Sequence, residues 1–145
     1  VLAEIQSMVL DAGNGAGDGS NVGSVLYVRG MYAAMLAAEA IATAQDIHGV
    51  ADITPAMMRD GMEALNITNA RMEELGMPLV GPEFSVSCEN HGGSGLGIVQ
   101  RWDAAAGAFV ALTDYIEPDN SVTAPLVEAD AAAFAAENNI TPGCL

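Results

Sequence analysis

Residues 23–49 read GSVLYVRGMYAAMLAAEAIATAQDIHG, the longest predominantly apolar stretch of the chain. Its many alanines are strong helix formers, so the stretch predicts one long helix. The hydroxyl of Ser24 is suited to cap the first turn, and Gly49 is suited to the left-handed residue that ends a helix. At about 1.5 Å per residue, a helix from Ser24 to His48 is about 35 Å long. The rest of the chain is expected to be organised around it.

A helix of this length raises the question of a membrane span, because about 20 apolar residues are enough to cross a bilayer. Arg29 and Glu39 argue against it, since each costs about 2.5 to 3.5 kcal/mol at the bilayer centre. Neither end is flanked by a cluster of Lys or Arg. The sequence therefore favours a central helix that other elements bury on several sides.

Composition limits the classes of partner. The chain has 145 residues, enough for one domain with a core, and a net charge of −15 from 4 basic and 19 acidic side chains. Nucleic acids and anionic membranes attract Lys/Arg patches, so neither is expected as a partner. The sequence starts at Val1 without a charged and apolar leader, which suggests a processed or excised piece of a longer protein.

The two cysteines, Cys88 and Cys144, are predicted to form one disulfide, which favours an extracytoplasmic location. A bridge closing a loop of 56 residues (144 minus 88) stabilises a fold by roughly 4 kcal/mol. The alternative is two separate buried thiols. Cys88 and His91 also have a spacing that a zinc site uses, but further good ligands are scarce, so no metal or cofactor is predicted. A Cys88–His91 hydrolase is the enzyme alternative, and it is not favoured.

Shorter helices are predicted on both sides of the long one. Apolar residues recur at helical spacing over residues 2–12, and a glycine-rich connector follows at 13–21. Thr54 and Pro55 form a typical helix start, and Thr68 begins another short helix. The methionines at 58 and 62 share one helix face with Leu65 and are expected to fill a core.

The C-terminal part predicts a hairpin and a helix. Residues 96–102 and 108–116 have strand character, and Trp102 is expected to pair with Phe109 across the hairpin. Thr123 is expected to cap a final helix with Pro125 in its first turn. Because a lone two-stranded hairpin is marginally stable, the inventory suggests that further structure belongs with this chain.

From about residue 21 to residue 144 the chain resembles the C-terminal part of the substrate-binding proteins of ABC transporters, of the branched-chain amino acid type. The resemblance rests on the order and spacing of several segments rather than on one motif. They are LYVRGMYAAMLAAEAIATAQ (26–45), MRDGMEALN (58–66), ARMEELGMP (70–78), FSVSCENHGGSG (84–95), VQRWDAAAGAFVALTDYIEP (99–118) and ADAAAFAAENNITPGC (129–144).

This resemblance implies an α/β fold class: a fragment of a type I periplasmic-binding fold, mostly helical with a C-terminal β-hairpin. Residues 1–82 would form the helical portion of one lobe. Residues 83–145 would form the crossover hairpin and the C-terminal helix of the other lobe. The whole chain would then be the C-terminal third of a two-lobe protein.

The implied function is that of a periplasmic, non-enzymatic solute-binding component of an ABC importer. It would bind a small solute such as an amino acid by hinge closure and deliver it to a membrane permease. Tyr27 would pack on the solute and Arg29 would meet its carboxylate, although both also suit purely structural roles. The alternative is a small acidic interaction module without solute binding, and the fragment itself has the potential to dimerise.

Overall fold

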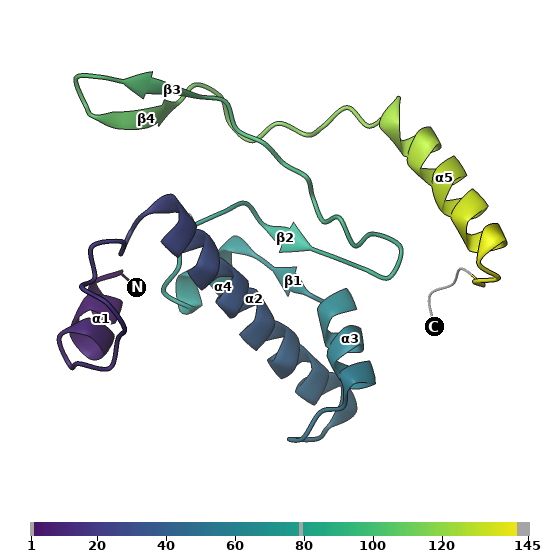
Figure 1. The fold of residues 1–145 in the computed structure, drawn as a ribbon, viewed down its shortest axis with the longest axis horizontal. Helices are drawn as coiled ribbons and strands as arrows, with labels where there is room; N and C mark the ends of the chain where they lie inside the picture. The colour runs from purple at the N-terminus through teal and green to yellow at the C-terminus, as the bar shows by residue number, and fades with distance from the viewer. Residues whose placement is uncertain (1, 79, 142–145) are drawn as a thin grey trace. The chain divides into compact units, whose positions relative to one another are not determined.

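The structure is a computed structural model that describes residues 2–78 and 80–141. The chain divides into two compact units, residues 1–93 and residues 94–145 (Figure 1). The first unit contains the helices α1, η1, α2, α3 and α4 and the strands β1 and β2. The second unit contains the strands β3 and β4 and the helix α5. Each unit is described by itself below.

The first unit is built on helix α2, Val25–His48, which is the long helix that the sequence predicts. The hydroxyl of Ser24 accepts a hydrogen bond from the backbone N–H of Tyr27, which satisfies one of the free donors of the first turn. Gly49 ends the helix in the left-handed conformation, with φ of 66°. Both predicted caps are confirmed.

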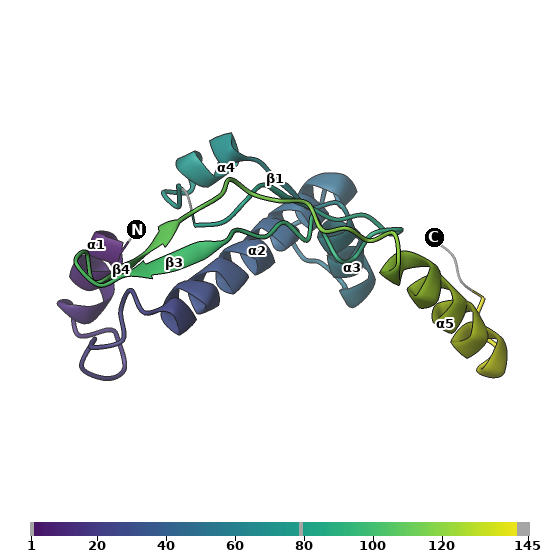
Figure 2. The ribbon, with the colours of Figure 1, turned by 90° about the horizontal axis from the view of Figure 1, so that it is seen from above.

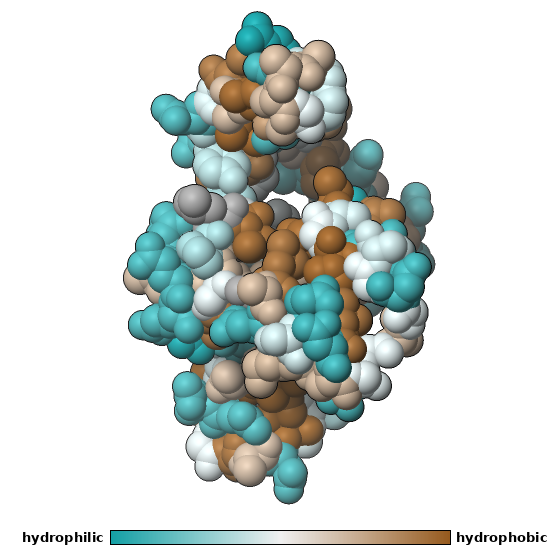
Figure 3. Space-filling model, turned by 90° about the vertical axis from the view of Figure 1, so that its left-hand side faces the viewer, coloured by the Kyte–Doolittle hydropathy of each residue, from teal (hydrophilic) through white to brown (hydrophobic). Residues whose placement is uncertain are grey.

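The expected burial of α2 is not confirmed. Among the described residues only Ala40 and Ala44 of this helix are buried, whereas Val25, Leu26 and Ile47 are more than half exposed. The space-filling view shows hydrophobic residues (brown) at the surface among hydrophilic ones (Figure 3). The apolar composition of α2 therefore exceeds what the described residues cover.

Helix α3, Pro55–Glu63, follows α2 and packs against its C-terminal half (Figures 1 and 2). The predicted start is confirmed, because the hydroxyl of Thr54 accepts from the N–H of Met57 and Pro55 occupies the first turn. The two helices meet at Gly61, which is buried against the backbone of Ala40 and Ala44. A side chain at this position would overlap α2, so the close approach requires glycine.

A small sheet and a short helix complete the first unit. Strand β1, Asn66–Ile67, pairs antiparallel with β2, Phe84–Ser85, and helix α4, Asn69–Glu74, lies between them in sequence. The predicted cap at Thr68 is confirmed by its hydrogen bond from the N–H of Arg71. Four buried side chains form the core: Ala40, Leu65, Ile67 and Met72.

The N-terminal segment is helical, as predicted, but not uniformly so. Leu2–Ile5 forms the α-helix α1, and Gln6–Leu10 continues as the π-helix η1. Turns and bends then lead through the glycine-rich connector to α2.

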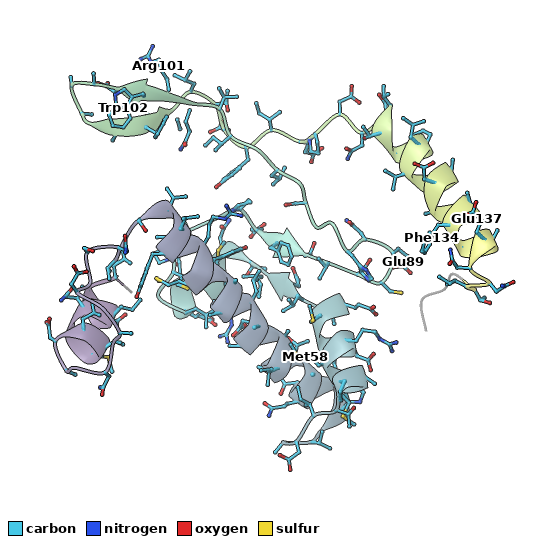
Figure 4. The ribbon with its side chains drawn as sticks, in the orientation of Figure 1. Met58, Glu89, Arg101, Trp102, Phe134 and Glu137 are labelled. Atoms are coloured by element: carbon cyan, nitrogen blue, oxygen red, sulfur yellow. The ribbon has the colours of Figure 1, made fainter. Side chains whose placement is uncertain are left out.

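The second unit contains the predicted hairpin. Strand β3, Gln100–Asp103, pairs antiparallel with β4, Ala108–Ala111, and a bridge between Gly97 and Ile116 extends the pairing. Trp102 lies opposite Phe109, with ring centroids 5.3 Å apart in an edge-to-face arrangement, which confirms the predicted pair. Because neighbouring strand residues point to opposite faces, Arg101 lies on the other side of the hairpin from Trp102 (Figure 4).

Helix α5, Thr123–Glu137, ends the described part of the second unit. The prediction that Thr123 caps it was wrong: the cap position is Val122, and no side-chain cap bond forms there. The helix begins at Thr123, one residue earlier than predicted, and the N–H of Ala124 donates to the carbonyl of Asn120 in its first turn. Ala135 is its buried residue.

The predicted fold class was wrong. Within residues 2–78 and 80–141 the strands form two separate two-stranded antiparallel sheets, and the structure is otherwise mostly helical. A type I periplasmic-binding fold needs a sheet of parallel strands with crossover helices, and the described strands of two to four residues form no parallel pair. The predicted division of the chain into two lobe portions, residues 1–82 and 83–145, stays a prediction.

Candidate functional site: an apolar groove in the first unit

The first unit has a groove between α2, α3 and β2, with a cavity volume of about 590 Å³. Its lining is largely apolar and includes Met58 of α3, which Figure 4 labels. The apolar lining residues are Ala33, Leu36, Ala37 and Ala40 of α2, Pro55, Met58 and Met62 of α3, and Leu65, Phe84 and Val86.

Charged lining residues are already paired within the chain. Arg59 donates to a carboxylate oxygen of Asp60 at 3.0 Å, and the Nε2 atom of His91 lies 3.3 Å from a carboxylate oxygen of Glu63. Asp60 also meets Nε2 of His48 at 3.0 Å, which ties the end of α2 to α3. The hydrogen bond from Arg59, followed by that from His48, holds the pKa of Asp60 below its usual range.

A second charged contact joins α2 to α4. The guanidinium of Arg71 donates to both carboxylate oxygens of Glu39, at 2.8 and 2.9 Å, and also to Glu74 at 2.7 Å. These hydrogen bonds, with Glu39 first, raise the pKa of Arg71 above its usual value. The side chain of Glu39 is 14% exposed, so Arg71 supplies the partner that a nearly buried carboxylate requires.

Tyr27 and Arg29, the predicted ligand-binding residues, are outside this groove. Tyr27 is half-buried and Arg29 is exposed, and both lie near the N-terminal end of α2. Arg29 has no ion-pair partner in the part of the chain that the structure describes. No observation brings a solute to either residue, and their role stays a prediction.

The predicted disulfide and the zinc alternative that was not favoured both involve the loop after β2. The structure holds Cys88 in a disulfide, but its predicted partner Cys144 lies outside the described residues, so the pairing stays a prediction. His91 is paired with Glu63, as described above. Among residues 2–78 and 80–141, no three His, Cys, Asp or Glu side chains are grouped to hold a metal ion.

The sequence pointed to one wall of the groove and missed the others. The predicted methionine face, with Met58, Met62 and Leu65, lines it. The expectation that this face fills a core is confirmed for Leu65, a member of the core cluster against which Met58 packs, but Met62 is exposed. Phe84, Val86 and His91 come from a segment about 20 residues further along the chain. Their approach depends on the pairing of β1 with β2, which such short strands do not signal in sequence.

Comparison with solved structures decides what this chain is similar to. It resembles an ABC transporter permease. The crystal structure, described as that of an ABC transporter permease from the Pseudomonas fluorescens group, matches 98% of this chain at 34% sequence identity with a TM-score of 0.82. The chain spans about a third of that protein, because the match covers 34% of its length. No protein-family model matches the chain, and no curated protein matches it.

This match overturns the resemblance drawn from sequence. The similar protein is described as a permease rather than a solute-binding protein, so the assignments to a branched-chain amino acid receptor and to the periplasm were wrong. The alternative, an acidic interaction module, has no support from the match either. The transporter context itself agrees with the expectation.

Proposed function

We propose that this chain is part of the permease of an ABC transporter, a non-enzymatic component that works with a separate ATP-hydrolysing subunit. One observation carries the proposal: the chain shares its fold and a third of its residues, over 98% of its length, with a protein described as such a permease. Because the chain spans only about a third of that protein, the activity belongs to the whole polypeptide.

The proposal places the whole polypeptide in the inner membrane, and α2 is the helix to consider first. It is the one helix of the described residues that is long and apolar enough to cross a membrane, judged by length and composition. Arg29 and Glu39, however, are separated by only nine uncharged residues, 30–38. Nine residues of helix span about 14 Å. The hydrocarbon core is about 30 Å thick, so a span would have to carry a charge into it.

The contacts of Glu39 add to the cost of placing α2 in the membrane. Its partner Arg71 lies on α4, and α3 brings Arg59, Asp60 and Glu63 against the same half of α2. Moving this cluster into lipid would cost several kcal/mol even with the charges paired. We therefore expect α2 to fold with α3 and α4 outside the hydrocarbon core, and other segments of the polypeptide to cross it.

Membrane fractionation tests the proposal. The full polypeptide that contains these residues is expressed in cells, and the membranes are washed with alkaline carbonate, which removes proteins that are not inserted. The proposal expects the full polypeptide to stay in the washed membranes and to be released only by detergent. Recovery of the full polypeptide in the soluble fraction, without detergent, would overturn it.

A further inference from the structure

The groove of the first unit is largely apolar and open to the surface. Of the 24 residues of α2, only two of those described are buried, and Met62 at the groove is 52% exposed. Apolar surface gains free energy on leaving water in proportion to its area, so an open apolar groove favours an apolar occupant. The question is which occupant it takes.

We propose that the groove is covered by an apolar segment of the same polypeptide, from the part that lies outside residues 1–145. The similar permease structure carries this fold within a chain about three times as long, since the match covers 98% of this chain but 34% of that one. About two thirds of that chain thus has no counterpart here and is available for packing. The inference concerns packing only, so it holds or fails independently of the membrane location proposed above.

The polar groups at the groove argue against a small polar solute as occupant. Binding sites for such solutes use a few convergent polar groups that are free to hold the ligand. Here Arg59 is bonded to Asp60, and Glu63 is paired with His91. Each charged lining side chain therefore already has a partner within the chain, and the other lining residues are apolar.

The charge of the chain argues against a second copy as occupant. Each chain carries a net charge of −15, so two copies brought face to face would repel each other. The same charge disfavours contact with anionic lipid headgroups. An uncharged apolar segment tethered in the same polypeptide avoids this repulsion, and its tether also raises its effective concentration at the groove.

Methionine oxidation tests the proposal with internal controls. Peroxide oxidises exposed methionines to sulfoxides, and mass spectrometry of peptides measures the rate at each site. The reporter is Met62. Met8, which is 70% exposed and belongs to η1, is the exposed control, and Met72, which is fully buried, is the protected control. The full polypeptide in detergent is compared with the isolated 145-residue chain.

The proposal expects Met62 to be oxidised at least about tenfold more slowly relative to Met8 in the full polypeptide than in the isolated chain. Equal relative rates in both would overturn it. Protection that appears in the isolated chain only at high concentration would show that a second copy is the occupant and would also overturn it. Protection of Met62 in the full polypeptide that requires added lipid would also overturn it. An intact mass of the source polypeptide no larger than this chain would overturn it as well.

A pair of substitutions on α2 gives an independent measurement. Ala37 and its neighbour Ala38 are both exposed, but only Ala37 lines the groove. In the full polypeptide, Ala37→Phe is expected to lower the melting temperature by several degrees more than Ala38→Phe, because the larger side chain competes with the covering segment. In the isolated chain the two variants should melt alike. A full polypeptide in which the two variants also melt alike would contradict the proposal.

Discussion

Replacing Gly61 by Ala should separate α2 from α3. A Cβ atom at this position would overlap the carbonyl oxygen of Ala40 and would lie 2.7 Å from the Cβ and 2.9 Å from the backbone nitrogen of Ala44. Ordinary contacts begin at 3.4 Å, so the helices must move apart by at least 0.7 Å (3.4 minus 2.7). Because the obstructing atoms belong mainly to backbone, no side chain can rotate away to make room.

Two opposing effects set the magnitude. Alanine is a better helix former than glycine by about 1 kcal/mol, which favours the variant. Overpacking a close contact costs about 1 to 3 kcal/mol, and here the contact is with backbone, so the upper end applies. The free energy of unfolding of the first unit should therefore fall by about 2 kcal/mol.

The control is Gly30→Ala in α2, the helix against which Gly61 of α3 packs. A Cβ atom there would meet nothing within 4 Å, so only the helix propensity changes and stability should rise by about 1 kcal/mol. Urea unfolding, followed by hydrogen exchange of peptides from α2 and α3, reads the first unit alone. If Gly61→Ala proves as stable as Gly30→Ala, the close packing of these two helices is refuted.

Three further predictions concern the contacts that hold the first unit. Thr54→Ala removes the hydroxyl that caps α3 and should lower the free energy of unfolding by about 1 kcal/mol in urea titration, whereas Thr54→Ser should restore most of it. Glu39→Gln should lower the melting temperature and reduce its dependence on salt, because Arg71 loses the carboxylate that accepts two of its hydrogen bonds. An unchanged melting temperature would count against that pair. Because Arg59 lowers the pKa of Asp60, the stability from this contact is fully present above the ordinary pKa of 3.8 and is lost as pH falls below it. Asp60→Asn should remove this acid-dependent part of the free energy of unfolding. Identical profiles of unfolding free energy against pH for the two proteins would disprove it.

Local rules recovered the elements well. Ser24 and Gly49 bound the long helix, Thr54 and Pro55 begin the next one, and the Trp102–Phe109 pair fixes the hairpin register. Each of these signals acts within a few residues, through a cap, a turn or a cross-strand pair, so the sequence alone displays it.

Packing between distant segments was not recoverable in the same way. The burial of α2 was overestimated because an apolar composition shows how much surface would gain from burial, not how much is buried. In the described structure only Ala40 and Ala44 of α2 are fully buried. The groove needs Phe84 and His91 beside α3, which depends on a two-residue strand pairing that has no periodicity to detect. The family segments pointed to ABC transporters, but they did not separate a receptor from a permease.

The central claim is that these residues belong to the permease of an ABC transporter. It is tested most directly by isolating the full polypeptide from detergent-solubilised membranes of its source, through an affinity tag, and identifying its companions by mass spectrometry. The account predicts a stable complex with an ATP-binding subunit that hydrolyses ATP. A polypeptide that is recovered from the soluble fraction alone, with no such subunit, would contradict it.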